Sequence, residues 1–209
     1  MLPLHHIPIN SGMNKNKYRP TFCVFTVPHS GTRFTMEYFT KLGVKTWNPS
    51  NLVDVPTYWQ VHAGNHYLGH QTLDDYKLLH KLPVVVTVTH PHRNWVSFTA
   101  RDKSYEQNVD CWEYLLKELP TLNYYLFDIN CRASERKMHL INILNFLNLY
   151  TEEREALTDE WCAEWPSSHA QSYHNKDQYL THNRLPSGYD YDQLQFAVDW
   201  YESLPTNDY

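Results

Sequence analysis

The sequence predicts a three-layer α/β/α protein with a central parallel sheet, folded as a single domain of 209 residues. Apolar β-type runs begin at Phe22, Pro83 and Tyr124, and segments of helical periodicity lie between them. The run at 84–89 is continuous and β-branched, which is typical of a strand covered on both faces. Strands that alternate with helices favour a parallel sheet with helices on both faces.

The first elements follow from local signals. Residues 1–20, rich in proline and asparagine, are expected to form an irregular arm. Segment 32–42 is predicted to be a helix because its apolar residues recur at near-helical spacing, and Gly43 follows at the position of a left-handed C-cap. Residues 44–70 are interpreted as a functional excursion that contains one short strand, 58–61.

The later elements are assigned in the same way, from apolar period and breaker residues. In chain order they are a short helix at 73–82, the strand at 84–89, a helix from near Arg93, an amphipathic helix at 109–119, a buried strand at 124–129, a long helix capped by Ser134, an acidic helix at 152–161 and a final helix at 191–204. Residues 150–209 are expected to form a helical and loop part over a ligand at the sheet edge.

The composition indicates a folded protein and disfavours nucleic acid as a partner. Hydrophobic residues make up 42% and aromatic residues 15% of the chain, which excludes a disordered protein. With 18 Lys plus Arg against 23 Asp plus Glu, the formal charge is −5. An anionic ligand must therefore be held by local groups and not by a general positive field. The sequence allows a homodimer.

The remaining patterns indicate a soluble, cytoplasmic chain with reduced thiols and no metal site. Cys23, Cys111, Cys131 and Cys162 form no CxxC pair. No stretch approaches the roughly 18 apolar residues of a membrane helix, and the N-terminus lacks a basic region followed by a long apolar run. Membrane insertion is therefore not expected. The 13 histidines are scattered, with neither HExxH nor zinc-type spacing.

The segment Pro-His-Ser-Gly-Thr-Arg, which joins the first strand to the first helix, has the layout of an anion site. The N–H groups of the first helical turn converge there, and the helix dipole adds positive charge. Ser30 and Thr32 add hydroxyl donors, and Gly31 allows close approach of the backbone. His29 and Arg33 supply side chains that are, or can become, cationic. A phosphate or sulfate fits such a loop.

Neither common nucleotide motif matches this segment. The GxxxxGK[ST] loop of nucleoside triphosphatases needs a lysine directly after its last glycine, and here Thr32 follows Gly31. The dinucleotide fingerprint GxGxxG is missing as well.

The chain resembles the sulfotransferase family at three places, in the family's order. The first resembles the family's Pro-x-Ser-Gly-Thr loop, the second its apolar strand followed by Arg-x-Pro-x-x-x-x-x-Ser, and the third its Tyr-Glu-Asp-Leu strand end and closing helix. These places are residues 28–32, residues 84–97 with Pro91 and Ser97 in the Pro and Ser positions, and Tyr125–Asn130 running into Ile143–Leu149. The resemblance implies the P-loop NTPase-like sulfotransferase fold.

The resemblance also implies a donor and a set of site residues. Members of the family transfer a sulfuryl group in line from 3′-phosphoadenosine 5′-phosphosulfate (PAPS), without a metal, and release 3′,5′-adenosine bisphosphate (PAP). The acceptor here would be a hydroxyl, or an amine, of a small molecule or carbohydrate. The implied PAPS contacts are His29, Ser30, Gly31, Thr32 and Arg33 at the 5′-phosphosulfate, and Arg93 and Ser97 at the 3′-phosphate, with Arg184 in the polar loop that could fold over the ligand.

Two positions depart from the family pattern. His29 stands where the family has a lysine or arginine that neutralises the bridging oxygen as sulfate leaves. Protonated His29 could serve, and Arg33 is the other cation in reach. Thr89 aligns with the arginine that binds the 3′-phosphate. That role would pass to one of three basic residues, His90, Arg93 or Arg101.

The acceptor must lose a proton, which calls for a histidine or a carboxylate as base. Spacing to the second motif favours His66, whereas the position directly after the short strand favours His62, since the family's catalytic histidine also follows such a strand. Asp54 is the carboxylate alternative.

We therefore expect a PAPS-dependent sulfotransferase. Two alternatives stay open at this point. One is a nucleotide-dependent kinase with a divergent phosphate loop, which would need magnesium and a nucleoside triphosphate. The other is a nucleotide-binding protein of the same fold in which His29 and Thr89 mark lost catalysis.

Overall fold

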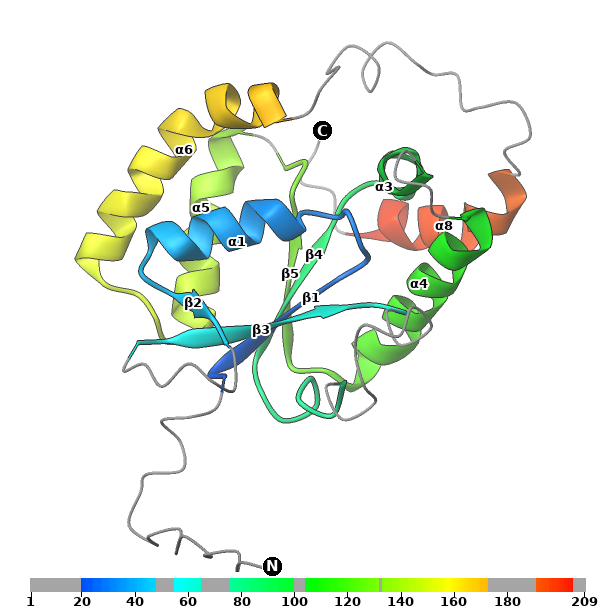
Figure 1. The fold of residues 1–209 in the computed structure, drawn as a ribbon, viewed down its shortest axis with the longest axis horizontal. Helices are drawn as coiled ribbons and strands as arrows, with labels where there is room; N and C mark the ends of the chain where they lie inside the picture. The colour runs from blue at the N-terminus through cyan, green and yellow to red at the C-terminus, as the bar shows by residue number, and fades with distance from the viewer. Residues whose placement is uncertain are drawn as a thin grey trace, which may run out of the picture.

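The computed structural model describes residues 20–47, 55–64, 76–99, 104–131, 133–172 and 191–204. These residues form a five-stranded, all-parallel sheet in the order β2-β3-β1-β4-β5 (Figure 1). The strands are β1 (Phe22–Thr26), β2 (Lys45–Thr46), β3 (Thr57–His62), β4 (Val84–Val88) and β5 (Tyr124–Asp128). The first described strand, β1, is thus the central strand of the sheet.

Helices cover both faces of this sheet, which confirms the predicted three-layer α/β/α architecture. The helices are α1 (Thr32–Lys41), α3 (Pro91–Thr99), α4 (Tyr105–Glu118), α5 (Ala133–Phe146), α6 (Glu152–Ser172) and α8 (Gln195–Ser203), with 3₁₀ turns η3 (Leu119–Thr121) and η4 (Tyr191–Leu194). One face packs against α1, α5 and α6, and the other against α3, α4 and α8 (Figure 1).

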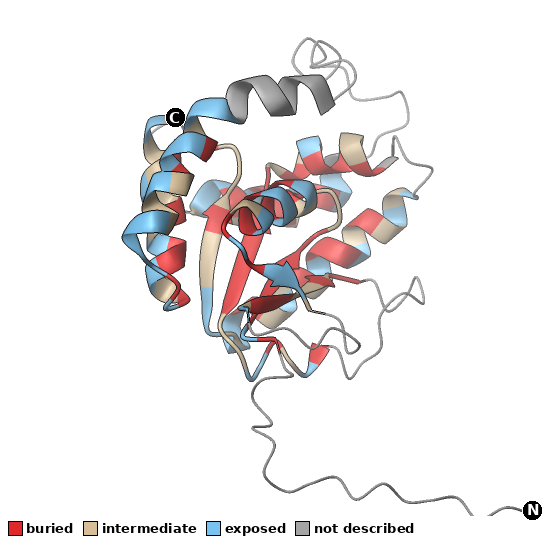
Figure 2. Ribbon diagram, turned by 60° about the vertical axis from the view of Figure 1, so that its left-hand side comes forward, coloured by how far each residue is buried: buried red, intermediate tan, exposed pale blue. Residues whose placement is uncertain are grey.

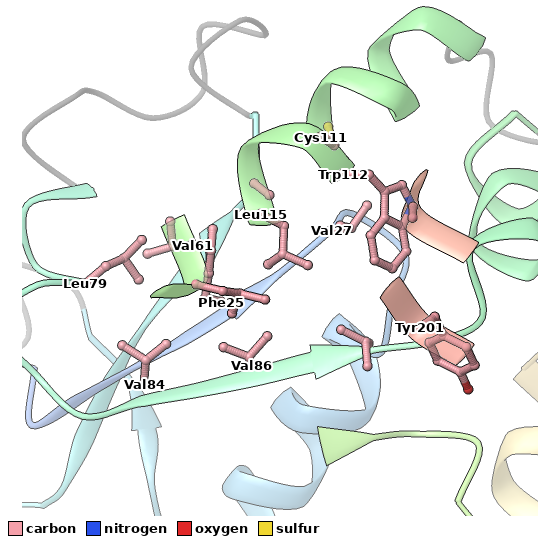
Figure 3. Packing of buried hydrophobic residues seen from close by; sticks show 14 of the residues in the cluster. Phe25, Val27, Val61, Leu79, Val84, Val86, Cys111, Trp112, Leu115 and Tyr201 are labelled. Atoms are coloured by element: carbon pink, nitrogen blue, oxygen red, sulfur yellow. The ribbon is translucent and has the colours of Figure 1, made fainter. Parts of the chain in front are cut away.

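Alternation along β1 and β4 divides the core between the two faces. Every residue of both strands is buried, and Figure 2 shows the centre of the sheet in the colour of buried residues. Phe25 and Val86 point to one face and pack with Trp112 and Leu115 of α4 (Figure 3). Val85 points the other way, into the cluster under α1 and α5. This two-sided burial explains the continuous β-branched run in the sequence.

Several helices begin where local chemistry favours a start. Helix α4 begins earlier than predicted because Ser104 and Gln107 form a reciprocal capping box. Helix α3 begins at Pro91 and not near Arg93, since proline is well suited to a first helical position. Helix α1 ends as predicted, with Gly43 at a φ of +73°.

The prediction of a buried strand at 124–129 is wrong. Strand β5 lies at the edge of the described sheet, where it pairs with β4, and Phe127 alone of its residues is fully buried. Tyr124 at its start is 39% exposed. Met36 of α1 and Met138 of α5 are apolar but 44% and 52% exposed.

The segment interpreted as an excursion contributes directly to the sheet. Strand β3 lies between β2 and β1, so the predicted strand at 58–61 is an inner strand and not an isolated one. Residues 77–82, expected to be the end of a short helix, form hydrogen-bonded turns, and the start of that helix lies outside the described residues. The arm at 1–19 and the polar loop at 173–190 also lie outside the described residues.

None of the helices in the described ranges combines the length and apolar character needed to cross a membrane. All four cysteines are described, and none of them forms a disulfide.

Candidate active site

Three strands end side by side at the carboxyl edge of the sheet. The register pairs Thr26 at the end of β1 with His62 at the end of β3 and with Thr87 of β4. The loop between β1 and α1 therefore leaves the centre of the sheet with one neighbouring strand end on each side. This edge is where open parallel sheets bind their ligands.

The loop starts with a type II β-turn over residues 27–30. The Ser30 N–H donates to the Val27 carbonyl oxygen at 3.0 Å, which closes the turn. Pro28 occupies the second position, and His29, at the third, has a φ of +71°. Proline followed by a residue with positive φ defines type II. His29 thus adopts a left-handed backbone conformation that is uncommon for residues other than glycine.

Two threonines at the strand ends hold the loop in place. The Thr87 hydroxyl donates to the Ser30 carbonyl oxygen at 2.8 Å, and the Thr26 hydroxyl lies 2.9 Å from the same oxygen. Asn94 of α3 donates to the Pro28 carbonyl oxygen and to the Ser30 hydroxyl. Buried side chains of β1, β4 and α3 therefore hold the loop in place.

Gly31 forms the junction between loop and helix. It is the N-cap residue of α1, has a φ of +90°, and no side chain caps the helix there. A Cβ atom on Gly31 would lie 2.8 Å from Cγ2 of Ile129, so the position has no room for a larger residue. The first turn of α1 consequently presents its N–H groups at the edge of the sheet, as an anion site requires.

His62 meets the start of this helix from the neighbouring strand. Its Nε2 lies 3.2 Å from the Thr32 hydroxyl oxygen, and its backbone oxygen accepts a 2.6 Å hydrogen bond from the Tyr76 hydroxyl. Burial lowers the pKa of His62 to about 4, so the imidazole is neutral near pH 7. A neutral imidazole beside an anion loop can accept a proton.

The low pKa of His62 predicts that the protein loses stability on acidification. Between pH 6.5 and 4 the unfolded chain binds a proton at this position that the folded protein does not. Stability is therefore retained above pH 6.5, and the free energy of unfolding should fall by about 2 kcal/mol between pH 7.5 and pH 5 from His62 alone. Urea unfolding at the two pH values measures this change. The His62→Gln variant should lack that part of the fall, and an identical fall in both proteins would contradict the assignment.

The predicted 3′-phosphate residues lie above β4 and β5. Arg93 is exposed, and its Nη1 donates to Oδ1 of Asn130 at 3.2 Å. The Asn130 amide in turn donates to the Thr89 hydroxyl at 2.5 Å. Ser97 lies one helical turn after Arg93, on the same side of α3, and is half-buried. Thr89 is thus bonded to Asn130, two residues after the end of β5.

The ionisable groups around Arg93 bear on which basic residue could supply the cation predicted for the 3′-phosphate. Burial, together with the charges of His92 and Arg93, lowers the pKa of His90 to about 4, against an opposing effect of Asp128. His90 is therefore neutral near pH 7. The Asp128 carboxylate accepts hydrogen bonds from Asn130 and from the Tyr201 hydroxyl of α8. Of the three basic residues considered for this role, Arg93 is the described one that supplies a cation.

The structure brings together part of the set of residues predicted for the site. His62 contacts Thr32, which follows Ser30 and Gly31 in the chain, and Arg33 is exposed on the first turn of α1. The ring of His29 packs edge-on against Phe98 of α3, with 5.7 Å between centroids. Four other residues named from the sequence, His66, Asp54, Arg101 and Arg184, lie outside the described residues.

Sequence reasoning missed the residues that hold the loop, namely Thr26, Thr87 and Asn94. The two threonines carry a weak signal, because each is a polar residue at the end of an otherwise apolar strand. Asn94 carries none, since an asparagine near a helix start is read as a turn former.

Among the described residues, no group of three or more His, Cys, Asp and Glu side chains is placed to hold a metal ion.

The fold that carries this site matches the sulfotransferase fold. A solved structure that it resembles is that of mouse sulfotransferase SULT7A1 complexed with PAP, with a TM-score of 0.51 and 14% sequence identity. The match covers 90% of this chain and 85% of the mouse protein. At this identity the likeness shows the fold alone. No protein-family profile and no curated protein sequence matches the chain.

Proposed function

We propose that the protein is a sulfotransferase that uses PAPS to sulfate a hydroxyl, or an amine, of a small molecule or carbohydrate. The observation that carries the proposal is the 3.2 Å contact between His62 and Thr32. This contact brings a buried, neutral imidazole directly beside the first turn of the helix that follows the loop, which supports a role for His62 as base. The likeness of the fold to a sulfotransferase that binds PAP supports the same function.

The loop would bind the phosphosulfate end of the donor. The uncapped N–H groups of α1 and the Ser30 hydroxyl supply hydrogen-bond donors, and Gly31 keeps the backbone open to the anion. The Thr32 hydroxyl would turn from Nε2 of His62 to the anion when the donor binds, which leaves Nε2 open to the acceptor's proton. His29, when protonated, and Arg33 are the cations proposed to neutralise the bridging oxygen as it becomes a phosphate oxygen of PAP. Arg93 and Ser97 would bind the 3′-phosphate, and Arg184, which lies outside the described residues, stays a predicted contact of the nucleotide.

His62 would act as the general base. The acceptor hydroxyl gives its proton to Nε2 of His62 while its oxygen forms a bond to sulfur, and the bond between sulfur and the bridging oxygen breaks in line. The electron pair of the broken bond stays on the bridging oxygen, which becomes a phosphate oxygen of PAP. The sulfated product leaves as an anion whose counter-ion comes from solvent. Because burial keeps His62 neutral, the base is in its proton-accepting form over the whole physiological pH range.

The test of the donor site is thermal stabilisation by PAP. Stabilisation at 100 times the dissociation constant should reach about 2.7 kcal/mol, which raises the Tm of a protein this size by several degrees. The Ser30→Ala/Thr32→Ala double variant should lose that shift. Its unliganded Tm should fall, because Asn94 loses a buried hydrogen-bond partner, so the shift is measured against the variant's own unliganded Tm. Thr40→Ala, on the exposed side of the same helix, is the matched control and should retain the shift.

The same assay separates the alternatives. Stabilisation by ATP with magnesium and none by PAP would overturn the proposal in favour of a kinase. Stabilisation by PAP without release of PAP from PAPS, across phenolic, alcoholic, amine and carbohydrate acceptors, would identify a nucleotide-binding protein without transfer activity. An unchanged PAP shift in the double variant would mean that the loop is an ordinary helix start.

A further inference from the structure

Asn94 lies beneath the loop, and its side chain uses all of its hydrogen-bonding capacity. It is fully buried on α3. Its Nδ2 donates to the Pro28 carbonyl oxygen at 2.7 Å and to the Ser30 hydroxyl oxygen at 2.8 Å. Its Oδ1 accepts from Asn108 at 2.7 Å and from Trp112 at 3.1 Å, both on α4. An asparagine amide has two donor hydrogens and two acceptor lone pairs, and here each has a partner.

Trp112 fixes the orientation of this amide. An indole nitrogen can only donate a hydrogen bond, so the Asn94 atom that faces it must be the oxygen. The NH₂ group therefore faces the loop, and it cannot be exchanged with the oxygen by a flip of the amide. Helix α4 thus determines which atom of Asn94 the loop meets.

The contact with Pro28 determines the type of the turn. The Pro28 carbonyl belongs to the central peptide of the turn at 27–30, and rotation of that peptide converts a type II turn into type I. Type I would return His29 to the ordinary negative φ and relieve the left-handed strain seen at +71°. Because the Asn94 amide holds the Pro28 oxygen, the strained form is retained.

The contact with Ser30 sets the role of its hydroxyl. The Ser30 oxygen accepts a hydrogen from Asn94, so its own proton is directed elsewhere. A hydroxyl in this state is prepared to donate to an oxygen of a bound anion. The same amide therefore fixes both the backbone and the donor group of the loop.

We propose that Asn94 is a positioning residue that holds the loop in its anion-binding form through the Pro28 carbonyl and the Ser30 hydroxyl. As a statement about donor binding, the inference rests on the proposed function of the loop. Its effect on the turn does not depend on any ligand.

The sharpest variant is Asn94→Asp. The introduced carboxylate has nearly the same shape and can still accept from Asn108 and Trp112, but when ionised it offers no hydrogen to Pro28 or Ser30. If the binding-competent turn falls to a tenth of the population, the affinity for PAP falls about tenfold. Affinity should recover as the carboxyl is protonated, because the acid form can donate once. Asn94→Ala removes the same donors without a charge and should lose affinity without that pH-dependent recovery.

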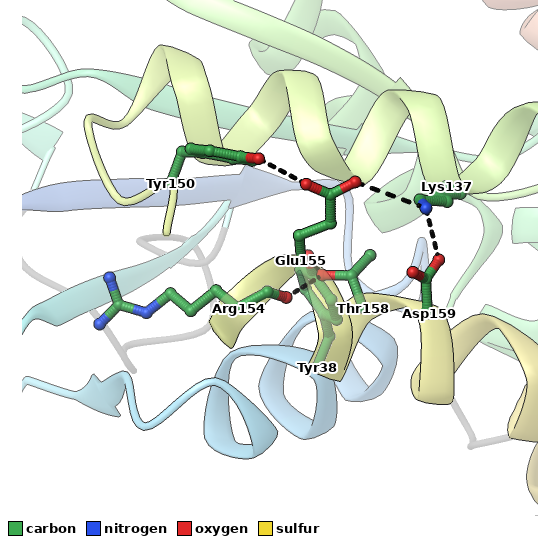
Figure 4. A network of polar contacts seen from close by, with 7 residues as sticks. All are labelled: Tyr38, Lys137, Tyr150, Arg154, Glu155, Thr158 and Asp159. Atoms are coloured by element: carbon green, nitrogen blue, oxygen red, sulfur yellow. Dashed lines mark hydrogen bonds and ion pairs between the residues drawn. The ribbon is translucent and has the colours of Figure 1, made fainter. Parts of the chain in front are cut away.

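Thr158→Ala is the matched control for loss of a buried polar contact. Thr158 is fully buried on α6, bonds to the Tyr38 hydroxyl at 2.9 Å, and lies in a separate polar network (Figure 4). This variant should be destabilised but should bind PAP like the unmodified protein. An equal loss of affinity in Thr158→Ala and in both Asn94 variants would overturn the proposal, as would unchanged affinity in the Asn94 variants.

A second measurement needs no ligand. His29→Gly favours the type II turn by itself, so its effect on the free energy of unfolding should differ between the unmodified protein and the Asn94→Ala variant. Non-additive effects support the inference, since Asn94 holds the turn through Pro28 and Ser30; strictly additive effects would overturn it. If the unmodified protein does not bind PAP, the proposed function fails. The double-mutant cycle of His29→Gly and Asn94→Ala still decides the role of Asn94.

Discussion

Replacement of His62 by glutamine is expected to lower kcat for sulfuryl transfer by roughly 10²–10⁴-fold, the usual contribution of a general base. Glutamine can still form a hydrogen bond to Thr32, so the contact at the start of α1 can persist, but an amide cannot take the acceptor's proton at neutral pH. The affinity for PAP should change little, because His62 is neutral and contributes no charge to the donor site. Initial rates of PAP release from PAPS measure the effect.

The matched control is Tyr76→Phe, which removes the hydrogen bond to the backbone oxygen of His62 and leaves the imidazole in place. This variant should keep kcat within about tenfold of the unmodified protein, since the proposed base remains. The pH dependence of kcat/KM gives an independent reading. Because the pKa of His62 in the unliganded protein is about 4, kcat/KM should begin to fall on the acid side below pH 5 and not near pH 6.5. Full activity of His62→Gln would move the base to His66.

The central part of the site could be predicted because its signals are local. Strand β1, the loop and α1 are contiguous in sequence, and the period, the glycine and the hydroxyl residues are visible in about twenty positions. Strand β4 was equally clear because burial on both faces leaves a continuous apolar run. The assignment of β5 as a buried strand was wrong because an edge strand can have the same composition as an inner one.

The supports of the loop could not be predicted because they are long-range contacts. Asn94 bonds to atoms 64 and 66 positions earlier and to side chains 14 and 18 positions later. Nothing in the local sequence indicates that these groups meet. The turn itself was hidden for a different reason: Pro28 fits the second position of a type II turn, but the third position normally takes glycine or asparagine, and here it is His29.

The choice between His62 and His66 was also beyond local pattern. Position relative to the short strand favoured one and spacing favoured the other. The register of β3 against β1 places His62 level with Thr26, and its Nε2 contacts Thr32 in the first turn of α1, whereas His66 lies outside the described residues. Register is a property of the whole sheet and is set by the packing of both faces, so a single strand's sequence does not contain it.

Substitution of Gly31 by alanine is expected to abolish stabilisation by PAP and to destabilise the fold by about 1–3 kcal/mol. Two effects combine at this position. A φ of +90° is strained for any residue with a Cβ atom, and that atom would lie 2.8 Å from Cγ2 of Ile129, well inside contact distance. Relief of either effect requires the loop to move away from Ile129 and Thr87, which changes the direction of the first N–H groups of α1. Urea unfolding and the PAP thermal shift measure the two consequences.

Gly43→Ala separates backbone strain from steric overlap. Gly43 has a similar φ of +73°, but a Cβ atom there has no neighbour within 4 Å, and the residue lies at the opposite end of the same helix. This variant should carry the strain alone and keep the full PAP shift. Adding Ile129→Ala to Gly31→Ala should return part of the lost stability, because the overlapping methyl is removed. If both glycine variants bind PAP like the unmodified protein, Gly31 is a turn residue and the loop does not hold the donor.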